Sequence, residues 1–559
     1  MTKPWTESYP PGVSTELELG DYSSVVDVMD ESFRRFPDRV AYVCMGRELT
    51  FRQLDAASRA LAVWLQEQGA KPGDRVAIML PNILQFPVVL AGVLRAACVA
   101  VPVNPLYTAR ELQHQLDDSG ATVAIVLENF AGTLEEIIGK TSVERVVVAS
   151  MGDMLGLAKG SMVNFAVRHV KKLVPGYRLP GHVRFNAVLR SGKSGALKKH
   201  DCSLLSIAIL QYTGGTTGVS KGAILLHRCL VASMLASEQW MQPALQRKGL
   251  HGQATVMCAL PLYHVFSLVA CGLLGMRIGA KNILVPNPRD LNALIDAAVP
   301  HKIHLFPAVN TLYQALLAHP RFRELDFSEL AIAVGGGMAV QSRVARDWLQ
   351  ATGAPVVEAY GLSETAAGGT SNRTDIDSFT GTIGLPVPGI EIRIVDDSGN
   401  EVSGGAPGEI AIKGPQVMAG YWRRRDDHNQ VFTPDGYFKT GDIGIMDTSG
   451  FVRIVDRKKD MILVSGFNVY PNEIEEVVSR HPGVLECAAV GVPDEKAGEA
   501  VKVYIVKRDP QLAESDILAL CSQHLTRYKQ PRYIEFRDSL PKTNVGKILR
   551  RELRQPVAA

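Results

Sequence analysis

A glycine- and hydroxyl-rich segment follows an apolar strand candidate at residues 207–211. It reads Tyr212-Thr213-Gly214-Gly215-Thr216-Thr217-Gly218-Val219-Ser220-Lys221-Gly222. Glycines let the backbone curl so that several N–H groups converge on one point, which suits a polyphosphate. The hydroxyls and the Lys221 ammonium add further donors to an anion. The segment therefore predicts a phosphate-binding loop, and the alternative is a flexible glycine loop without a ligand.

The residues around Lys221 differ from those of a P-loop nucleotide triphosphatase. The Walker pattern has glycine immediately before the lysine and serine or threonine after it. Here Ser220 precedes the lysine and Gly222 follows it. The sequence therefore argues against an ordinary P-loop enzyme at this segment.

Further short motifs occur along the rest of the chain. In order, they are Pro261-Leu262-Tyr263-His264, Gly335-Gly336-Gly337, Tyr360-Gly361-Leu362-Ser363-Glu364-Thr365, Thr440-Gly441-Asp442, Arg453-Ile454-Val455-Asp456-Arg457-Lys458-Lys459, and Pro541-Lys542-Thr543-Asn544-Val545-Gly546-Lys547. With the glycine loop, this series resembles the acyl-adenylate-forming superfamily, which includes acyl- and aryl-CoA synthetases, luciferases and peptide-synthetase adenylation domains. The resemblance covers nearly the whole chain. Residues 435–442 and 456–471 most resemble bacterial long-chain-fatty-acid–CoA ligases.

The resemblance implies an ATP-dependent ligase that acts in two steps. A fatty carboxylate attacks the α-phosphate of ATP and releases pyrophosphate, and the thiol of coenzyme A then attacks the acyl-adenylate and releases AMP. ATP, Mg²⁺ and coenzyme A are the implied ligands. An aryl-CoA ligase and an acyl-AMP ligase feeding a carrier protein are alternatives within the superfamily. A non-catalytic nucleotide- or acyl-binding protein is a third interpretation, which the retained motifs disfavour.

Four residues are the catalytic candidates by this resemblance. Lys547 is expected to bridge the fatty carboxylate and the α-phosphate. Glu364 is the candidate Mg²⁺ ligand, because Mg²⁺ binds few carboxylates and shares phosphate oxygens, and Thr365 offers a hydroxyl to the metal or phosphate. His264 is expected near the pantetheine and acyl entrance. Without the motifs, the alternatives are a solvated lysine, a surface acid and a core histidine.

The adenosine is expected to lie between two of the motifs. Tyr360 is placed to stack on adenine, and the glycines Gly335–Gly337 let the base approach the backbone. Asp442 is expected to accept hydrogen bonds from the ribose hydroxyls, and Arg457 to reach the ribose or phosphate. A core aromatic and a turn-capping aspartate are the alternatives for Tyr360 and Asp442.

The resemblance also implies that the C-terminal domain rotates between the two steps. The expected hinge is Lys459. One orientation presents Lys547 to the reaction, and the other presents a loop containing Gly466, Phe467 and Tyr470 to the pantetheine arm of coenzyme A.

The acyl-binding region departs from the pattern of relatives. Leu268 stands where some relatives place an aromatic gate. Ala366-Ala367-Gly368-Gly369 follows Thr365, where relatives usually carry proline and branched residues. Small side chains there would widen the acyl pocket or loosen its floor, so the preferred chain length stays open.

The elements that must position these residues alternate between apolar β-rich runs and helical patterns, which predicts mostly parallel sheets covered by helices. The strand candidates are residues 76–80, 123–127, 146–149, 207–211, 283–285, 331–334 and 356–360, and the helix candidates are 51–68, 109–117, 291–298 and 340–352.

Short strands and turns after about residue 384 predict a β-rich subdomain at about 385–456. The last hundred residues predict an α+β unit with a helix at 471–480 and strands at 488–492 and 501–506. The predicted fold is therefore α/β: a large N-terminal domain (1–458) of mixed, largely parallel sheets flanked by helices, and a small mobile α+β lid domain (459–559).

Composition restricts the protein class. A chain of 559 residues exceeds one hydrophobic core and predicts at least two domains. The net charge of +3, from 60 basic and 57 acidic residues, gives no support for whole-chain nucleic-acid binding. The eight cysteines form no CxxC pair and indicate reduced, buried thiols. With no apolar signal region and no run of 18 uncharged apolar residues, we expect a cytoplasmic enzyme of small-molecule substrates, with a homodimer as an open option.

One segment has an unusual charge. Residues 154–200 contain ten Lys or Arg residues and no acid. The apolar residues of its first half, namely Met162, Ala166, Val170, Leu173 and Val174, fall on one helical face, whereas Arg168, Lys171 and Lys172 fall toward the other. One interpretation is a basic amphipathic helix on the anionic inner face of the cell membrane. The other is a core helix with a solvated basic face.

Overall fold

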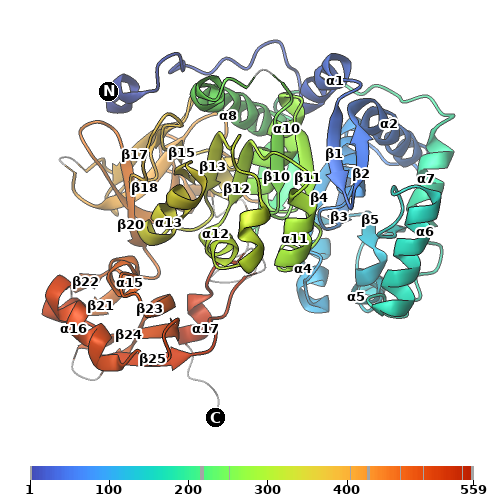
Figure 1. The fold of residues 1–559 in the computed structure, drawn as a ribbon. Coiled ribbons are helices and arrows are strands. Elements are labelled where there is room, and N and C mark those ends of the chain that lie inside the picture. Colours follow the sequence, from blue (N-terminus) through green and yellow to red (C-terminus); the bar gives the residue numbers. More distant parts are fainter. Residues whose placement is uncertain are drawn as a thin grey trace.

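The computed structural model describes residues 3–213, 220–250, 252–402, 405–424, 428–465, 467–494, 497–543 and 546–554. In this part of the chain the strands form four sheets, three of them before residue 458 and one after it. Figure 1 shows the last sheet and its helices as an orange-red unit below the larger body. The arrangement confirms the predicted α/β fold class with a large N-terminal and a smaller C-terminal part.

The first sheet has the strand order β7-β6-β5-β3-β4-β8-β9 and is parallel except for the β8–β9 pair. Its central strands are almost wholly buried apolar runs, as expected where helices cover both faces. The strands are β3 (Arg75–Met79), β4 (Val99–Pro102), β5 (Val123–Leu127), β6 (Arg145–Ala149), β7 (Val183–Arg184), β8 (Ile207–Tyr212) and β9 (Gly222–Leu226).

The second sheet has the order β16-β15-β14-β13-β12-β10-β11-β1-β2. Its middle is parallel and both ends are antiparallel. The strands are β1 (Val40–Cys44), β2 (Arg47–Thr50), β10 (Thr255–Cys258), β11 (Lys281–Leu284), β12 (Leu305–Ala308), β13 (Ile332–Gly335), β14 (Val356–Tyr360), β15 (Thr370–Ser371) and β16 (Leu385–Pro386).

Helices flank these two sheets and bury their apolar sides against them (Figure 1). The predicted strands and helices before residue 370 are all present, and their ends differ from the prediction by at most two residues. The helices are α1 (Val25–Arg35), α2 (Phe51–Glu67), α3 (Gln85–Arg95), α4 (Ala109–Ser119), α5 (Ala131–Glu135), α6 (Leu157–Phe165), α7 (Phe185–Gly192), α8 (His227–Arg247), α9 (Val265–Ser267), α10 (Leu274–Arg277), α11 (Leu291–Ala298), α12 (Asn310–Leu317) and α13 (Ser342–Thr352).

The third sheet is antiparallel and lies within the predicted β-rich region. Its order is β17-β18-β19-β20. A turn at residues 396–400 follows β17, and a turn at residues 447–451 connects β19 to β20. The elements are β17 (Glu391–Val395), β18 (Gly408–Lys413), α14 (His428–Val431), β19 (Phe438–Met446) and β20 (Val452–Arg457).

The C-terminal unit has a sheet and a core of its own. The strand order is β22-β21-β24-β23, and β25 pairs with β24 in parallel. Its core includes Ile474, Cys487 and Val503. The strands are longer than predicted, and the elements are β21 (Ile462–Val464), β22 (Phe467–Val469), α15 (Pro471–Ser479), β23 (Val484–Asp494), β24 (Gly498–Lys507), α16 (Glu514–His524), η9 (Arg527–Lys529), β25 (Tyr533–Arg537) and α17 (Arg550–Arg554).

In the basic segment, the basic and the apolar side chains both lie differently from what the helical pattern predicts. α6 continues into a π-helical turn, η4 (Ala166–Val170). Arg168, expected on the solvated face, points inward and forms a bidentate ion pair with Glu128, whose side chain is only 2% exposed. The backbones of Gly152 and Gly160 approach so closely that no side chain fits between them. The core-helix interpretation is therefore wrong for the apolar face, because its side chains lie outside.

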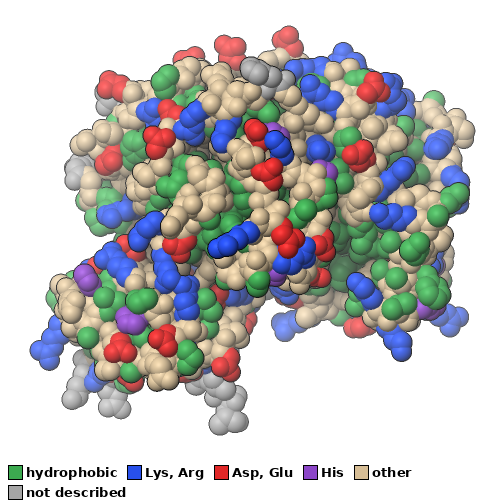
Figure 2. Space-filling model, in the orientation of Figure 1, with side chains coloured by type: hydrophobic (Ala, Val, Ile, Leu, Met, Phe, Trp, Pro, Cys, Tyr) green, Lys and Arg blue, Asp and Glu red, His purple; other side chains and the backbone are tan. Residues whose placement is uncertain are grey.

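Apolar side chains of this segment are exposed to solvent. They are Leu157, Met162, Phe165, Val170 and Leu173, each more than half exposed. Figure 2 shows hydrophobic side chains gathered on the right-hand lobe that carries α5 and α6, with basic side chains among them. Among the described residues, no helix has the length and hydropathy needed to cross a bilayer.

Candidate active site

A cavity of about 3470 Å³ lies between the large N-terminal part and the C-terminal unit. It is open to solvent and is lined from both sides, so residues far apart in the sequence meet in it. The predicted site residues that line it are Tyr212, Thr213, Ser220, Lys221, His264, Gly336, Gly337, Tyr360, Glu364, Asp442, Arg457, Lys459, Tyr470 and Lys547.

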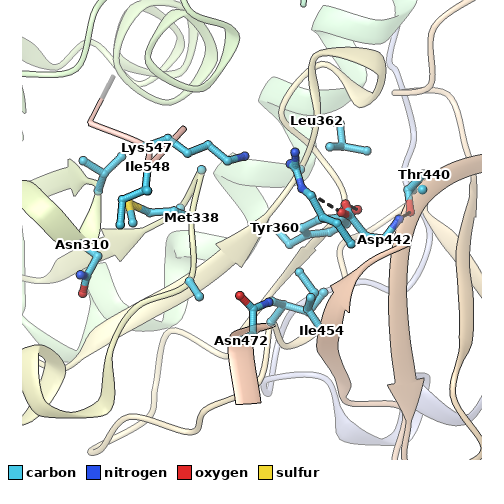
Figure 3. Close-up of a pocket in the computed structure, with 18 of the residues that line it drawn as sticks. Asn310, Met338, Tyr360, Leu362, Thr440, Asp442, Ile454, Asn472, Lys547 and Ile548 are labelled. Carbon is cyan, nitrogen blue, oxygen red and sulfur yellow. Dashed lines mark hydrogen bonds and ion pairs between the residues drawn. The ribbon is translucent and has the colours of Figure 1, made fainter. Parts of the chain in front are cut away.

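Lys547 extends from the C-terminal unit into this cavity. Figure 3 shows its ammonium end pointing toward Tyr360 and Asp442. Burial, together with the charge of the nearby Arg457, lowers the pKa of Lys547 to about 7, although Asp442 opposes the shift. An anion that binds beside this lysine would favour its protonated form.

Asp442 is the centre of a small polar cluster. It lies on β19, and its Oδ2 accepts a hydrogen bond of 2.6 Å from the hydroxyl of Tyr360 at the end of β14. Its Oδ1 lies 3.3 Å from Nε of Arg457, which ends β20. Burial raises the pKa of the Tyr360 hydroxyl well above its usual value, so the tyrosine stays a donor. The cluster places an aromatic ring, a carboxylate and a guanidinium at one wall of the cavity.

Glu364 lies in the short turn η7 (Ser363–Thr365) after β14. Burial raises the pKa of its carboxyl group, and a hydrogen bond of 2.7 Å from the Tyr421 hydroxyl to Oε1 lowers it in part. The Nζ of Lys221 lies 5.3 Å from the centre of the Tyr421 ring. Tyr421 therefore joins the two predicted phosphate-side residues, and no sequence motif had identified it.

Thr365 is not among the residues that line the cavity. It is fully buried, and its hydroxyl accepts from the N–H of Leu362 at 3.0 Å and lies 3.3 Å from the Leu362 carbonyl oxygen. The hydroxyl thus closes the turn that carries Glu364.

The predicted phosphate loop is described only at its two ends, because Gly214–Val219 lie outside the described residues. Tyr212 pairs with Gly222 across the antiparallel β8–β9 ladder, and the Thr213 N–H donates to the Lys221 carbonyl at 3.0 Å. A Cβ on Gly222 would meet the Tyr212 ring at 3.1 Å, which explains a glycine there. The ladder fixes both ends at the cavity wall.

Gly336, Gly337 and His264 form another part of the cavity lining. A Cβ on Gly336 would meet the Phe266 ring at 3.1 Å, so the backbone here has no room for a side chain, and Gly337 has a φ of +76°. Gly335 is packed against Val340 and is not among the cavity-lining residues. His264 caps α9, and burial, with a smaller effect of the Lys547 charge, lowers its pKa to about 4. His264 is therefore neutral at physiological pH.

The predicted hinge and coenzyme-A loop lie at the junction of the two parts. Lys459 stands between β20 and β21, and burial lowers its pKa to about 8. Tyr470 precedes α15 and lines the cavity. Phe467 is 56% exposed and stacks on Tyr528 with ring centres 4.8 Å apart, whereas Gly466 lies outside the described residues.

Direct contacts join the two parts in this orientation. The Asp456 carboxylate accepts from the Asn472 N–H at 2.8 Å. The amide of Gln314 donates to the Leu485 carbonyl at 2.7 Å, and Arg550 lies 3.7 Å from Asp456. Sequence reasoning missed Gln314, Asn472 and Arg550, because each acts through a partner that only the tertiary structure supplies.

Comparison with known proteins supports the same grouping of motifs. Residues 29–422 match the family of AMP-binding enzymes, and residues 473–547 match the C-terminal domain of that family. The chain is 50% identical over 555 residues to a long-chain-fatty-acid–CoA ligase of Escherichia coli O157:H7, covering 99% of this chain and 98% of the relative.

Two solved structures are similar over almost their full length. One is the anthranilate CoA ligase AuaEII in complex with anthranoyl-AMP, with a TM-score of 0.83, 26% identity, and coverage of 96% of this chain and 98% of that chain. The other is ATP-bound MatB from Rhodopseudomonas palustris, with a TM-score of 0.80, 27% identity, and coverage of 95% and 98%.

Proposed function

Because the chain belongs to the family of AMP-binding enzymes, we propose that it is an ATP-dependent long-chain-fatty-acid–CoA ligase. It forms an acyl-adenylate with release of pyrophosphate, and then acyl-CoA with release of AMP. The observation that carries the proposal is the meeting of Lys547 with Tyr360, Asp442 and Arg457 in one cavity of a chain that is half identical to such a ligase.

The first half-reaction brings a carboxylate to a polyphosphate, so it requires cations and oriented donors. In our proposal the segment Tyr212–Gly222 binds the β- and γ-phosphates, and Lys547 stabilises the charge that develops between carboxylate and α-phosphate. Tyr360 and the Gly335–Gly337 backbone hold adenine, while Asp442 and Arg457 hold the ribose. Asp442 has acceptor capacity for ribose hydroxyls beside its present two partners.

Magnesium fits the residues near the phosphate-side wall. Among the described residues, no group of three or more His, Cys, Asp or Glu side chains gathers as a metal cage. Glu364 supplies a single buried carboxylate beside Lys221 and Tyr421. Mg²⁺ commonly uses one or two carboxylates plus substrate phosphates, so Glu364 would hold it, and it would neutralise phosphate charge.

We further propose that the C-terminal unit changes orientation between the half-reactions about Lys459. Lys547 serves adenylation in the orientation seen here. Thioester formation uses the other face, where Gly466, Phe467 and Tyr470 meet the pantetheine arm and His264 lies at its entrance. The exposed Phe467 ring supports a ligand-facing role for that loop.

The experiment is a substrate series with the purified full chain. AMP and pyrophosphate release are measured with ATP, Mg²⁺, coenzyme A and acids from short to very long, with benzoate and anthranilate alongside. Release of AMP with palmitate but not with aromatic acids supports the proposal. Preference for aromatic acids would assign an aryl-CoA ligase, and adenylation without thioester formation would assign an acyl-AMP ligase.

The exposed apolar residues of the basic segment, which we call the exposed apolar stripe, favour a second proposal. This is a peripheral contact with an anionic membrane. The side chains of Leu157, Met162, Phe165, Val170 and Leu173 are more than half exposed, and Lys171 and Lys172 are exposed beside them. The Arg168–Glu128 ion pair fixes the helix in that orientation. Buried apolar area and cations near acidic lipid both favour binding at the interface.

Sedimentation with phosphatidylglycerol vesicles at low salt tests this contact. Replacing Met162, Phe165 and Val170 together by serine should abolish co-sedimentation, as should high salt. Leu205→Ser is the matched control, since Leu205 is 71% exposed elsewhere on the surface. Pelleting that is independent of lipid, or unchanged in the triple variant, would reject the contact. Analytical ultracentrifugation of the same preparation distinguishes a monomer from a homodimer, which the sequence left open.

A further inference from the structure

We propose that helix α4 positions the phosphate-binding segment through two side chains, His114 and Asp118, which are positioning residues for the ATP-dependent step. This inference rests on the proposed function and deepens it. Neither residue belongs to a motif of the series described above.

The two residues contact the two described ends of the segment. The Nε2–H of His114 donates to the carbonyl oxygen of Ser220 at 2.9 Å, where Nε2 must carry the proton because a carbonyl only accepts. The hydroxyl of Tyr212 donates to Oδ2 of Asp118 at 2.6 Å. Residues four apart lie on one helical face, so one side of α4 contacts the chain both before and after residues 214–219.

Asp118 also binds the turn after Tyr421. Its Oδ1 lies 3.0 Å from the guanidinium of Arg424, and its backbone carbonyl accepts from Nε1 of Trp422 at 3.0 Å. The backbone N–H of Trp422 donates to the Gly222 carbonyl at 2.8 Å. Asp118 therefore joins the start of the phosphate-binding segment to the segment whose tyrosine binds Glu364.

The helix itself is well fixed. Thr108 and Glu111 form reciprocal capping bonds at its start, and Gly120 ends it with a φ of +64°. Its other face buries Leu112 and Leu116. The Asp118 carboxylate is only 8% exposed, and its charge, with burial as the larger cause, raises the pKa of the Tyr212 hydroxyl. The contact with Tyr212 is thus made from a rigid element to a hydroxyl that stays a donor.

These contacts hold the ends of the segment in place, which the proposed chemistry requires. A turn that presents backbone N–H groups to a polyphosphate must hold its two ends at a fixed separation and orientation. The β8–β9 ladder supplies bonds within the sheet, and α4 adds bonds from outside it. Loss of either α4 contact should therefore weaken ATP binding and leave the acyl side unchanged.

The experiment compares Asp118→Ala with Asp117→Ala and His114→Ala with His114→Gln. Asp117 is the matched control, because it is the adjacent carboxylate on the same helix and its side chain is exposed. Glutamine keeps an amide N–H donor in place of the imidazole. The measurements are the KM values for ATP and palmitate in pyrophosphate release, thioester formation from supplied palmitoyl-AMP, ATP binding by calorimetry without acid, and the melting temperature.

The inference expects a KM for ATP about tenfold higher in Asp118→Ala and His114→Ala, as for loss of one hydrogen bond of this kind. The KM for palmitate and the reaction of palmitoyl-AMP should stay within about twofold of the unmodified enzyme. His114→Gln and Asp117→Ala should behave like the unmodified enzyme.

Two results would overturn the inference. One is an unchanged KM for ATP in both alanine variants. The other is an equal loss in every parameter together with a lowered melting temperature, which would mean a purely structural role. If the unmodified enzyme released no pyrophosphate with any acid, the proposed function would fail, and calorimetry of ATP binding would still decide the role of α4.

Discussion

Replacement of Lys547 by alanine should separate the two half-reactions. The side chain points toward the wall formed by Tyr360 and Asp442, and in this orientation it is one of the groups that the C-terminal unit adds to the cavity. Removing one preorganised stabiliser of developing charge typically costs about 3–4 kcal/mol. That corresponds to a loss of about 10²–10³-fold in adenylation rate. Thioester formation from supplied palmitoyl-AMP should remain largely intact.

Lys547 should also give the enzyme a characteristic pH dependence. Its pKa in the free protein is about 7, so its charge is lost as the pH rises through neutrality. We expect kcat/KM for ATP to fall over that range, since this parameter reports groups of the free enzyme. Lys547→Arg keeps its charge and should remove this fall, although Lys459, with a pKa of about 8, contributes a later one.

The same lysine should act on stability with a known sign. Its pKa is lower in the folded than in the unfolded chain, so the unfolded chain binds more protons between about pH 7 and 10.5. The free energy of unfolding should therefore rise with pH across this window. Lys547→Met should flatten the rise, measured as the urea midpoint of the C-terminal unit against pH.

The assays are stopped-flow pyrophosphate release and acyl-CoA formation, with Lys542→Ala as the control. Lys542 is five residues away and pairs with Glu486 at 2.5 Å. Equal loss of both half-reactions in Lys547→Ala, or a similar effect in Lys542→Ala, would refute the assigned role.

Three further changes test other parts of the structure. Lys459→Pro should spare adenylation and impair thioester formation, because proline fixes φ at the hinge; unchanged overall turnover would contradict the hinge. Tyr421→Phe removes the donor that lowers the pKa of Glu364, so the acidic limb of kcat/KM for ATP should move to higher pH, and an unmoved limb would separate Tyr421 from Glu364. Arg168→Met leaves the buried Glu128 with the single, longer contact to Arg184 at 3.4 Å in place of its bidentate pair, so the urea midpoint should fall by the equivalent of about 2 kcal/mol, and an unchanged midpoint would mean that the pair does not fix α6.

The sheets could be predicted from sequence because their strands are nearly pure apolar runs. Residues 123–127, 291–298 and 356–360 have the predicted bounds. In a parallel sheet covered on both faces, burial depends on composition more than on alternation. The strands of the C-terminal unit extend further than predicted, since their ends carry polar residues that cross-strand pairing holds in place.

The orientation of α6 could not be predicted in the same way. Its periodicity gives two faces, but only the buried Glu128, forty residues earlier, decides that Arg168 turns inward. The periodicity of apolar and charged residues does not predict which face of a helix packs on the core when a charged residue on one face has a buried partner. The exposed apolar stripe is the result.

The site was predictable where residues belong to motifs and not where they support them. Lys547, Asp442 and Glu364 are singled out by the resemblance of their motifs to a known family, whereas Tyr421, His114 and Asp118 act through contacts with chain segments far away in the sequence. Such residues need only one well-placed polar atom, which leaves no local pattern.

The charge distribution of the cavity gives a physical reason for the proposed alternation. Lys547, Lys459 and His264 all have lowered pKa values, because they are buried and repel their cationic neighbours. A nucleotide and a fatty carboxylate would supply the missing negative charge and favour the protonated lysine. Once pyrophosphate leaves, part of that stabilisation is lost, and this orientation of the C-terminal unit becomes less favourable. We infer that loss of pyrophosphate shifts the equilibrium between orientations, since a ligand shifts a conformational equilibrium only by its differential affinity for the two states.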